Sequence, residues 1–267
     1  MTRHLPAVAL FVVVLTLVSS VARAPGDKPA RWRERTTGMD FVLVQPQFFE
    51  MGTPAGVPGR EPQEVLHRVQ LTRAYYLGQY EVTQAQWRIL MDSNPSHFSG
   101  CDRCPVERVN YFEVEEFIRR LNARSGPGFR LPTEAEWELA CRAGGSAPFG
   151  HSPALSSHDA NIDGNYPYAA PVGPSRERTT AVGQFAPNRW GLFDMAGNAW
   201  EWVQDRHCPY PEGSAVDPVG ACESPYLVIR GGSWKFDGNS ARCGLRYTHR
   251  PQDRGFSLGF RLARTVN

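Results

Sequence analysis

The fold of this chain is decided by residues 191–202, GLFDMAGNAWEW. Two indole side chains, Trp200 and Trp202, flank the carboxylate of Glu201, and small residues with a Gly-Asn turn precede them. Large aromatic rings are placed where they can bury much apolar area. We therefore expect this stretch to pack in the core rather than to run along the surface.

The N-terminus has the features of a secretory signal peptide. Basic residues precede a mostly apolar run over residues 7–18, and small residues then mark a cleavage site after Ala22. A second site, after Ala24, is disfavoured by the Pro25 that would follow the cut. A membrane anchor is the alternative, but the apolar run is shorter than the ~20 residues that a span needs. The sequence thus predicts an exported protein, periplasmic or secreted, without membrane attachment after cleavage.

The predicted organisation is a signal peptide over residues 1–22, a loose Pro/Arg-rich lead-in over residues 23–37, and one domain over residues 38–267. The chain contains 25 Gly, 22 Pro and 7 Trp, which indicates a turn-rich fold held by aromatic packing. Its formal net charge of +2 gives no basic excess for nucleic acid or for an anionic membrane, so neither is expected as a partner.

Short strands and three helices are predicted from local patterns. Residues 41–44, 47–52, 65–71 and 75–82 have β character. Three capping boxes predict helix starts at Thr83 with Gln86, Asn110 with Glu113, and Thr133 with Glu136. Because helices cluster early and further short strands come late, the predicted fold class is α+β.

Six cysteines in an exported chain are available for disulfides. Cys101 and Cys104 form a C-x-x-C, for which local pairing is favoured over a redox motif. Half a zinc site is not favoured there, because no second C-x-x-C or His pair at ligand spacing accompanies it. Cys208 and Cys222 bracket a Pro/Gly-rich loop that a disulfide would close.

Three further motifs accompany residues 191–202: RLPTEAEWE at 130–138, RGGSW at 230–234 and LGFR at 258–261. In this order the four motifs resemble the formylglycine-generating enzyme family, also called the sulfatase-modifying-factor domain. The resemblance covers about residues 38–264. It implies an elaborated C-type-lectin-like fold with much irregular structure, and a structural disulfide between Cys141 and Cys243.

The resemblance does not extend to the family's copper ligands. The aerobic enzymes hold copper(I) with two cysteines between the Gly-Gly-Ser motif and the structural cysteine, and oxidise a substrate cysteine. Here residues 233–242, SWKFDGNSAR, contain no cysteine. Because copper(I) prefers soft thiolates, neither copper nor formylglycine formation is expected. The iron-dependent branch is also not expected, because its His-x-x-x-His-x-Glu pattern is missing.

The rest of the family's site is matched in part. Ser233 and Trp234 match its floor, and Trp200 matches a residue near it. The alternative is that residues 230–234 are only a tight strand-turn whose glycines allow close backbone approach. Several polar groups beside this segment are candidates to line a ligand groove or a solvated rim: Lys235, Asp237, Arg242, Arg246, His249 and Arg250.

The resemblance also implies calcium. The residues that match the family's second calcium site are Asp194, Gly197, Ala199 and Glu201, which offer the hard oxygen ligands that Ca²⁺ prefers. Asn161 and Ile162 match the start of the first site, whose later ligands are not evident. The alternative for the second site is that Asp194 caps a turn and Glu201 pairs with an arginine.

Three functions stay open at this point. The missing cysteines favour a non-oxidase binding or accessory module, with a peptide, protein or carbohydrate ligand in its groove. The second function is an enzyme of different chemistry on the same scaffold, such as an exported maturation factor. The third is a true formylglycine-generating oxidase.

Overall fold

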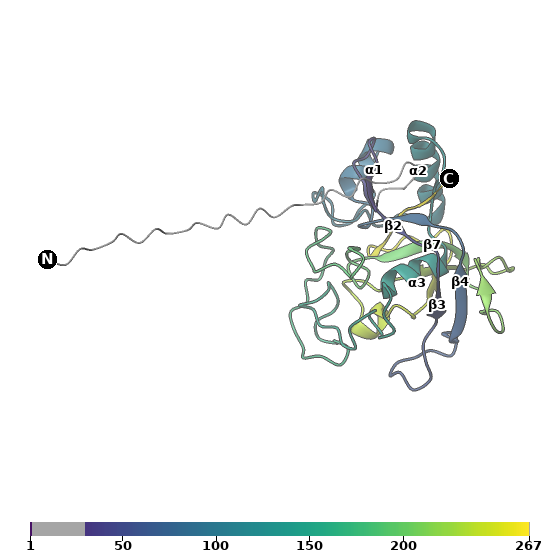
Figure 1. Ribbon diagram of the computed structural model, residues 1–267. Helices are drawn as coiled ribbons and strands as arrows, with labels where there is room; N and C mark the ends of the chain where they lie inside the picture. Colours follow the sequence, from purple (N-terminus) through teal and green to yellow (C-terminus); the bar gives the residue numbers. More distant parts are fainter. Residues whose placement is uncertain (2–29, 267) are drawn as a thin grey trace.

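The computed structural model describes Met1 and residues 30–266 (Figure 1). The predicted signal peptide therefore lies outside the described residues, Met1 apart. In the described part, no helix combines the length and apolar character that crossing a membrane requires. Within residues 30–266, short strands, three α-helices and long loops alternate, which confirms the predicted α+β class.

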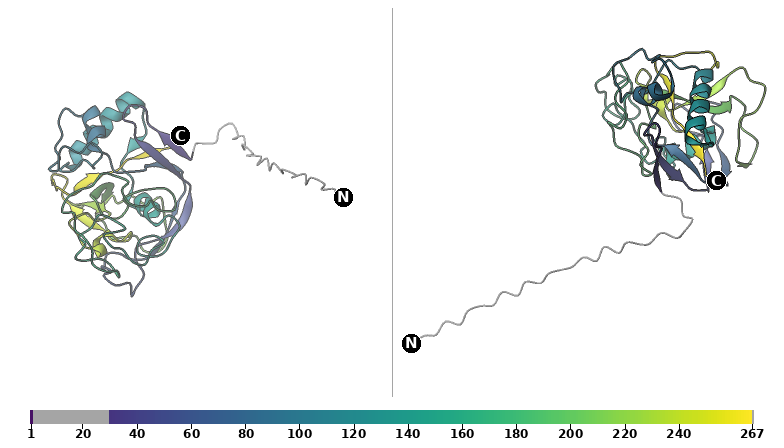
Figure 2. Two further views of the ribbon diagram at one scale, coloured as in Figure 1. Left: turned by 90° about the vertical axis from the view of Figure 1, so that its left-hand side faces the viewer. Right: turned by 90° about the horizontal axis from the view of Figure 1, so that it is seen from above.

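The three helices begin where the capping boxes predict. They are α1 (Gln84–Leu90), α2 (Tyr111–Ser125) and α3 (Glu134–Arg142). In each, the side chain of the N-cap residue accepts the N3 backbone N–H and the N3 side chain accepts the N-cap N–H. Figures 1 and 2 show α1 and α2 together at one end of the domain and α3 at its centre. All residues of α3 are buried, so this helix runs through the core.

The strands of the described residues form three small sheets. The first has the order β1-β2-β5-β12-β6, with β1 (Arg31–Arg33), β2 (Asp40–Val44), β5 (Tyr75–Gly78), β12 (Ala263–Thr265) and β6 (Phe129–Arg130). The second has the order β10-β9-β7-β11, with β10 (Tyr247–His249), β9 (Leu227–Arg230), β7 (Trp200–Arg206) and β11 (Leu258–Phe260). The third joins β3 (Gln47–Met51), β4 (His67–Leu71) and β8 (Ala215–Val216).

The stretch that decides the fold packs as expected. Trp200 and Trp202 lie on β7, an inner strand of the second sheet, and both are buried. Trp137 of α3 donates its Nε1–H to Glu201 between them, at 2.7 Å. The helix and the central sheet are thereby joined through the core by the acidic residue of the Trp-Glu-Trp motif.

The predicted loose lead-in is wrong for residues 31–37. Arg31–Arg33 form β1, which pairs antiparallel with β2. Glu34 follows and is buried, and its carboxylate accepts the backbone N–H groups of Thr36 and Thr37, both at 2.6 Å. The sequence does not reveal this strand, because its three residues contain a single apolar side chain, that of Trp32. The ordered domain thus begins before residue 38.

Every cysteine is paired. The disulfides join Cys141 to Cys243, Cys208 to Cys222, and Cys101 to Cys104. All three predicted pairings are confirmed, and the described residues contain no free thiol. The Cys141–Cys243 bond ties the end of α3 to the segment that follows the 3-10 helix Gly238–Ala241.

Candidate functional site

The Arg-Gly-Gly-Ser-Trp motif forms the tight strand-turn that the sequence left as an alternative. Arg230 ends β9, and Gly231 and Gly232 have φ angles of +98° and +73°. A Cβ on Gly232 would lie 2.9 Å from the Cα of Ala241, closer than side-chain atoms approach a backbone. The turn therefore needs glycine, and it presses Ser233 against the 3-10 helix.

Two donors beside this turn are buried without a partner. Ser233 Oγ and Trp200 Nε1 make no hydrogen bond to any residue that the structure describes. Leaving such a group unpaired costs about 1–3 kcal/mol, so buried donors are normally satisfied by protein, water or ligand. Phe236 packs edge-on against Trp200 with ring centroids 5.5 Å apart. Ser233, a predicted floor residue, and Trp200, predicted to lie near the floor, thus both have unused donor capacity.

Aromatic rings surround this region. Trp200 stacks on Tyr247 with ring centroids 5.5 Å apart. Trp234 packs edge-on against Phe98 at 5.4 Å and lies tilted against Phe256 at 6.3 Å. Tyr247 is 48 % exposed and Phe256 is 41 % exposed, so ring surface is open to solvent. Half-exposed rings offer apolar area for stacking a ligand. We call Ser233, Trp234, Trp200, Tyr247 and Phe256 the aromatic site.

Arg242 does not belong to the aromatic site. Its guanidinium is buried and bonded to protein, so it does not face a ligand groove. Nη1 and Nη2 donate to Glu64 at 2.7 and 2.8 Å, and Nε donates to Asn239 at 2.7 Å. The groove interpretation of Arg242 is therefore wrong. Arg246 is also buried, with two hydrogen bonds to Glu134 at 2.8 and 2.7 Å. Both arginines hold distant parts of the chain together.

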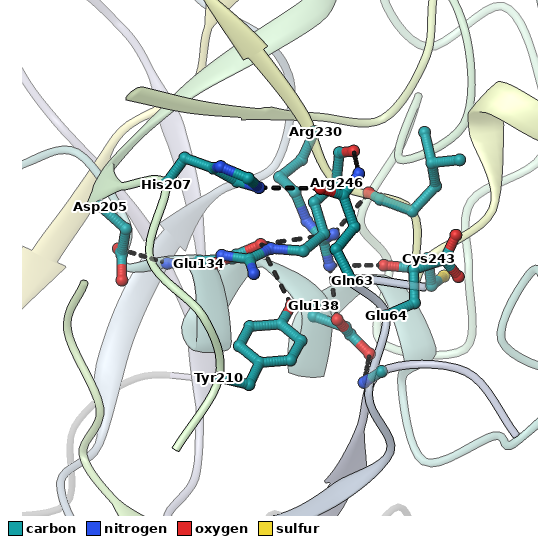
Figure 3. Close-up of polar contacts among 12 residues, drawn as sticks. Gln63, Glu64, Glu134, Glu138, Asp205, His207, Tyr210, Arg230, Cys243 and Arg246 are labelled. Atoms are coloured by element: carbon teal, nitrogen blue, oxygen red, sulfur yellow. Dashed lines mark hydrogen bonds and ion pairs between the residues drawn. The ribbon is translucent and has the colours of Figure 1, made fainter. Parts of the chain in front are cut away.

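Behind the turn lies a buried ionic network, shown in Figure 3. Glu138 of α3 accepts hydrogen bonds from Arg230 Nη2 at 2.5 Å, from Arg142 Nε at 2.8 Å and from the N–H of Gly52 at 2.8 Å. Arg230 Nη2 also donates to the carbonyl of Cys243 at 2.6 Å. The network fixes β9 and the segment around Cys243 to α3, and so it positions the turn. The acids of the RLPTEAEWE motif were its only signal in the sequence.

The residues predicted to bind calcium adopt the alternative arrangement. Glu201 is buried, and its carboxylate accepts Arg261 Nη2 and Nε and Trp137 Nε1, each at 2.7 Å. Asp194 accepts the N–H of Gly183 at 2.7 Å. Among residues 30–266, no group of three His, Cys, Asp or Glu side chains could hold a metal ion. Glu201 therefore does not fit as a calcium ligand while it holds Arg261.

The neighbouring residues of the predicted calcium sites are also bonded to protein. Gly197 has a φ of +81°, and a Cβ there would collide with the carbonyl of Asn161. Asn198 donates its N–H to that same carbonyl at 2.8 Å. The side chain of Asn161 donates to the carbonyl of Arg178 at 2.9 Å, and Ile162 is buried in the core. Asn161 and Ile162 thus support the turn that carries Gly197 and Ala199.

An excess of buried acid surrounds this turn. Glu81 accepts the N–H of Ala199 at 3.0 Å and the amide of Asn198 at 2.8 Å. Burial, and then the charges of Asp194 and Glu201, raise the pKa of Glu81 well above its ordinary value. Burial raises the pKa of Asp194 to about 6. Arg261 faces all three acids, so protonation or a bound cation must relieve the remaining charge.

Calcium at this turn stays a prediction. A cation bound only by the native state raises stability by mass action, by about 2.7 kcal/mol at a hundredfold excess over its Kd. We expect the melting temperature to rise between chelator and millimolar Ca²⁺ in the wild type, and not in Asp194→Ala. An unchanged wild-type melting temperature would show that protons, rather than calcium, relieve the acids.

Comparison with known proteins finds a family that matches nearly the whole described chain. A family described as the sulfatase-modifying factor enzyme 1-like domain matches residues 28–266. The chain is 32% identical to the formylglycine-generating enzyme of Streptomyces coelicolor over 68% of this chain and 59% of that protein. It is 29% identical to the chaperone protein LppX of Paenibacillus barcinonensis over 72% of this chain and 80% of that protein.

The chain also resembles part of a larger protein. It is 29% identical to the serine/threonine-protein kinase pkn1 of Chlamydia pneumoniae over 85% of this chain, and it spans 38% of that protein's length. The length of the Streptomyces relative is likewise matched only in part.

Two solved structures share the fold. PvdO from Pseudomonas aeruginosa superposes with a TM-score of 0.79, and Treponema denticola variable protein 1 with a TM-score of 0.78. Each is 26% identical to this chain and covers 90% of it, and each is matched over its full length. The predicted fold of the formylglycine-generating enzyme type is therefore confirmed.

Proposed function

Since this chain belongs to the family of sulfatase-modifying factor enzyme 1-like domains, we propose that it is a non-oxidase member of that family. In this proposal it is an exported binding or accessory module that holds a peptide, protein or carbohydrate ligand at the aromatic site. Two buried donors without partners and the half-exposed rings of Tyr247 and Phe256 support ligand contact there.

The observation that carries the proposal is the state of the cysteines. All six are consumed by disulfides, and Cys243 is bonded to Cys141 rather than open toward Ser233. Phe236, three residues after Ser233, packs its ring against Trp200 and offers no ligand to a metal. Residues 233–242 offer only hard oxygen and nitrogen groups, which have little affinity for copper(I). The aromatic site therefore lacks the thiolate ligands of the oxidase, which supports a binding role rather than an oxidase.

A maturation role on the same scaffold is the second candidate. It is favoured by the similarity to a protein named as a chaperone, which this chain matches over most of both lengths. An accessory module of this kind would act by holding its client at the aromatic site. Trp234→Ala, which removes exposed ring surface beside Ser233, distinguishes such a role from a purely structural turn, because it should weaken client binding without altering the fold.

We expect no conversion of a sulfatase-type cysteine peptide to formylglycine. Copper-loaded protein would be incubated with a Cys-x-Pro-x-Arg peptide, and mass spectrometry would follow the change from thiol to aldehyde. The expected result is no turnover and no copper retained after gel filtration. Turnover that persists in the wild type and vanishes in Cys243→Ser would show that Cys243 is catalytic and would overturn the proposal.

Export is tested at the N-terminus. We propose that the mature protein begins near Arg23, after a signal peptide over residues 1–22. Three disulfides support this, because they form and persist in oxidising compartments. N-terminal sequencing of the exported protein should find Arg23 or a residue close to it. An intact Met1 on a membrane-bound product would contradict this.

A further inference from the structure

A cavity of about 270 Å³ lies away from the aromatic site. It is bounded by β4, by the N-terminus of α3 and by the loop that the Cys208–Cys222 disulfide closes. Ser233, Trp234 and Trp200 do not line it. The cavity therefore offers a separate place for a ligand, and its function does not depend on the one proposed for the aromatic site.

The rim of the cavity is apolar. Pro209, Pro211, Pro218 and Val219 line it, together with the disulfide. Val219 is 45 % exposed, so the rim opens to solvent. A volume of this size fits a fragment or a single side chain rather than a drug-sized molecule. The walls thus suit a short apolar chain.

Arg246 and Tyr210 line the floor of the cavity and are bonded to neighbouring groups of the chain. Arg246 donates hydrogen bonds from Nε and Nη2 to the carboxylate of Glu134, and from Nη1 to the carbonyl of Cys208 at 2.8 Å. Tyr210 donates its hydroxyl to Glu134 at 3.2 Å, and its ring lies 3.9 Å from the Arg246 guanidinium carbon. Figure 3 shows this arrangement. The charge of Arg246 is therefore paired with that of Glu134.

Two residues on the floor of the cavity are acceptors with unused capacity. The first is Asp205, which has no ion-pair partner among the described residues. Asp205 is 3 % exposed and accepts only the N–H groups of Glu134 at 2.7 Å and Gly220 at 2.6 Å. Within residues 30–266 it forms no ion pair, whereas Glu134 and Glu138 both pair with arginines. Burial, and then the charge of Glu134, raise the pKa of Asp205 to about 7. The charge of Arg246 lowers this pKa, but it does not outweigh burial and the charge of Glu134.

The second acceptor is His67, which is 6 % exposed and lines the cavity. Its Nδ1 lies 2.9 Å from the carbonyl of Val65, so Nδ1 carries the proton, because a carbonyl can only accept. Nε2 is then a lone-pair acceptor in the neutral ring, and it has no partner in the part of the chain that the structure describes. Asp205 and His67 thus both present acceptor groups to the cavity.

We propose that this cavity binds a small cation, an ammonium or guanidinium group on a short apolar chain. Ammonium and guanidinium groups carry only donors, which matches the acceptors that Asp205 and His67 present to the cavity. The positive charge supplies Asp205 with the counter-charge that it lacks, and the chain lies against the proline rim. The cation is a free amine or the Lys or Arg side chain of a peptide, since both present the same group.

The test uses n-butylamine at pH 8, above the pKa of Asp205. Binding to the full-length mature protein would be followed by NMR chemical-shift changes, with n-butanol and butyrate as neutral and anionic probes of similar size. We expect butylamine to bind with a Kd on the order of 1 mM. Neither butanol nor butyrate should bind measurably. Butyrate binding as tightly as butylamine would overturn the proposal.

Two variants locate the site, and one serves as a matched control. Asp205→Asn should weaken butylamine binding at least tenfold. Val219→Phe narrows the rim without touching the floor and should do the same, which keeps the test valid if Asp205→Asn does not fold. Glu212→Gln removes an exposed acid of the same loop that does not line the cavity, and should leave binding unchanged. Equal affinity in the wild type and Val219→Phe would overturn the proposal.

The source of the cation is separated by a further probe. Acetyl-lysine amide, with its side-chain ammonium free, carries the same group on a peptide backbone. Tighter binding of this probe than of butylamine supports a peptide side chain as the occupant, and weaker binding supports a free amine. Failure of both probes would overturn the cavity proposal and leave the proposed function of the aromatic site untouched.

Discussion

Glu138→Gln is expected to lower the free energy of unfolding by about 3–5 kcal/mol. The substitution keeps the shape of the side chain and removes its charge. Arg230 is fully buried, and Glu138 is the acid at 2.5 Å from its Nη2. Without that acid, a guanidinium stays in the core without its nearest counter-charge. Urea unfolding, with the slope checked for two-state behaviour, measures the loss.

Glu116→Gln is the matched control. Glu116 also forms ion pairs with two arginines, Arg119 at 2.6 Å and Arg120 at 2.7 Å, but on the solvent side of α2. Water and salt screen such pairs, so its removal should leave the unfolding midpoint nearly unchanged. Equal midpoints for the two variants would show that the network behind the turn does not support the fold.

Removing the Cys141–Cys243 disulfide is the second large effect. The bond closes a loop across a sequence separation of 102, for which the chain-entropy estimate is about 4.7 kcal/mol. The double variant Cys141→Ala with Cys243→Ala should therefore lose a third or more of the roughly 5–15 kcal/mol that stabilises an ordinary domain. Thermal and urea unfolding under identical buffer conditions measure the loss.

The Cys208–Cys222 disulfide supplies the internal comparison. Its sequence separation is 14, so the same estimate gives about 3 kcal/mol. Its double Ala variant should be the more stable of the two. The opposite order would contradict the chain-entropy explanation and point to strain or residual structure in the unfolded chain.

Local signals predicted local structure well. All three capping boxes begin helices, because each box satisfies N–H groups within four residues and needs no distant partner. The pairing of Cys141 with Cys243 followed from family position rather than from spacing. The strand β1 escaped prediction, because an edge strand of Arg-Trp-Arg has a single large apolar residue to show a pattern.

The candidate site was less accessible to sequence reasoning. Arg242 lies beside the aromatic site in sequence, but Glu64, far away along the chain, draws its guanidinium into the core. Glu201 likewise forms an ion pair with Arg261. The parallel pairing of β11 with β7 brings these two residues side by side. Such partners are decided by tertiary packing. A charged residue near a motif can therefore be assigned to a groove only once its counter-ion is known.

The two arginines that bracket the Gly-Gly-Ser turn have a consequence for how this scaffold diversifies. Arg230 and Arg242 are both buried and bound to acids from other parts of the chain, Glu138 and Glu64. Residues 233–241 therefore lie between two arginines that are held in place by distant parts of the chain. Substitutions in this segment, including the loss or gain of cysteines, can change the chemistry of the site while Arg230, Arg242 and α3 keep their positions.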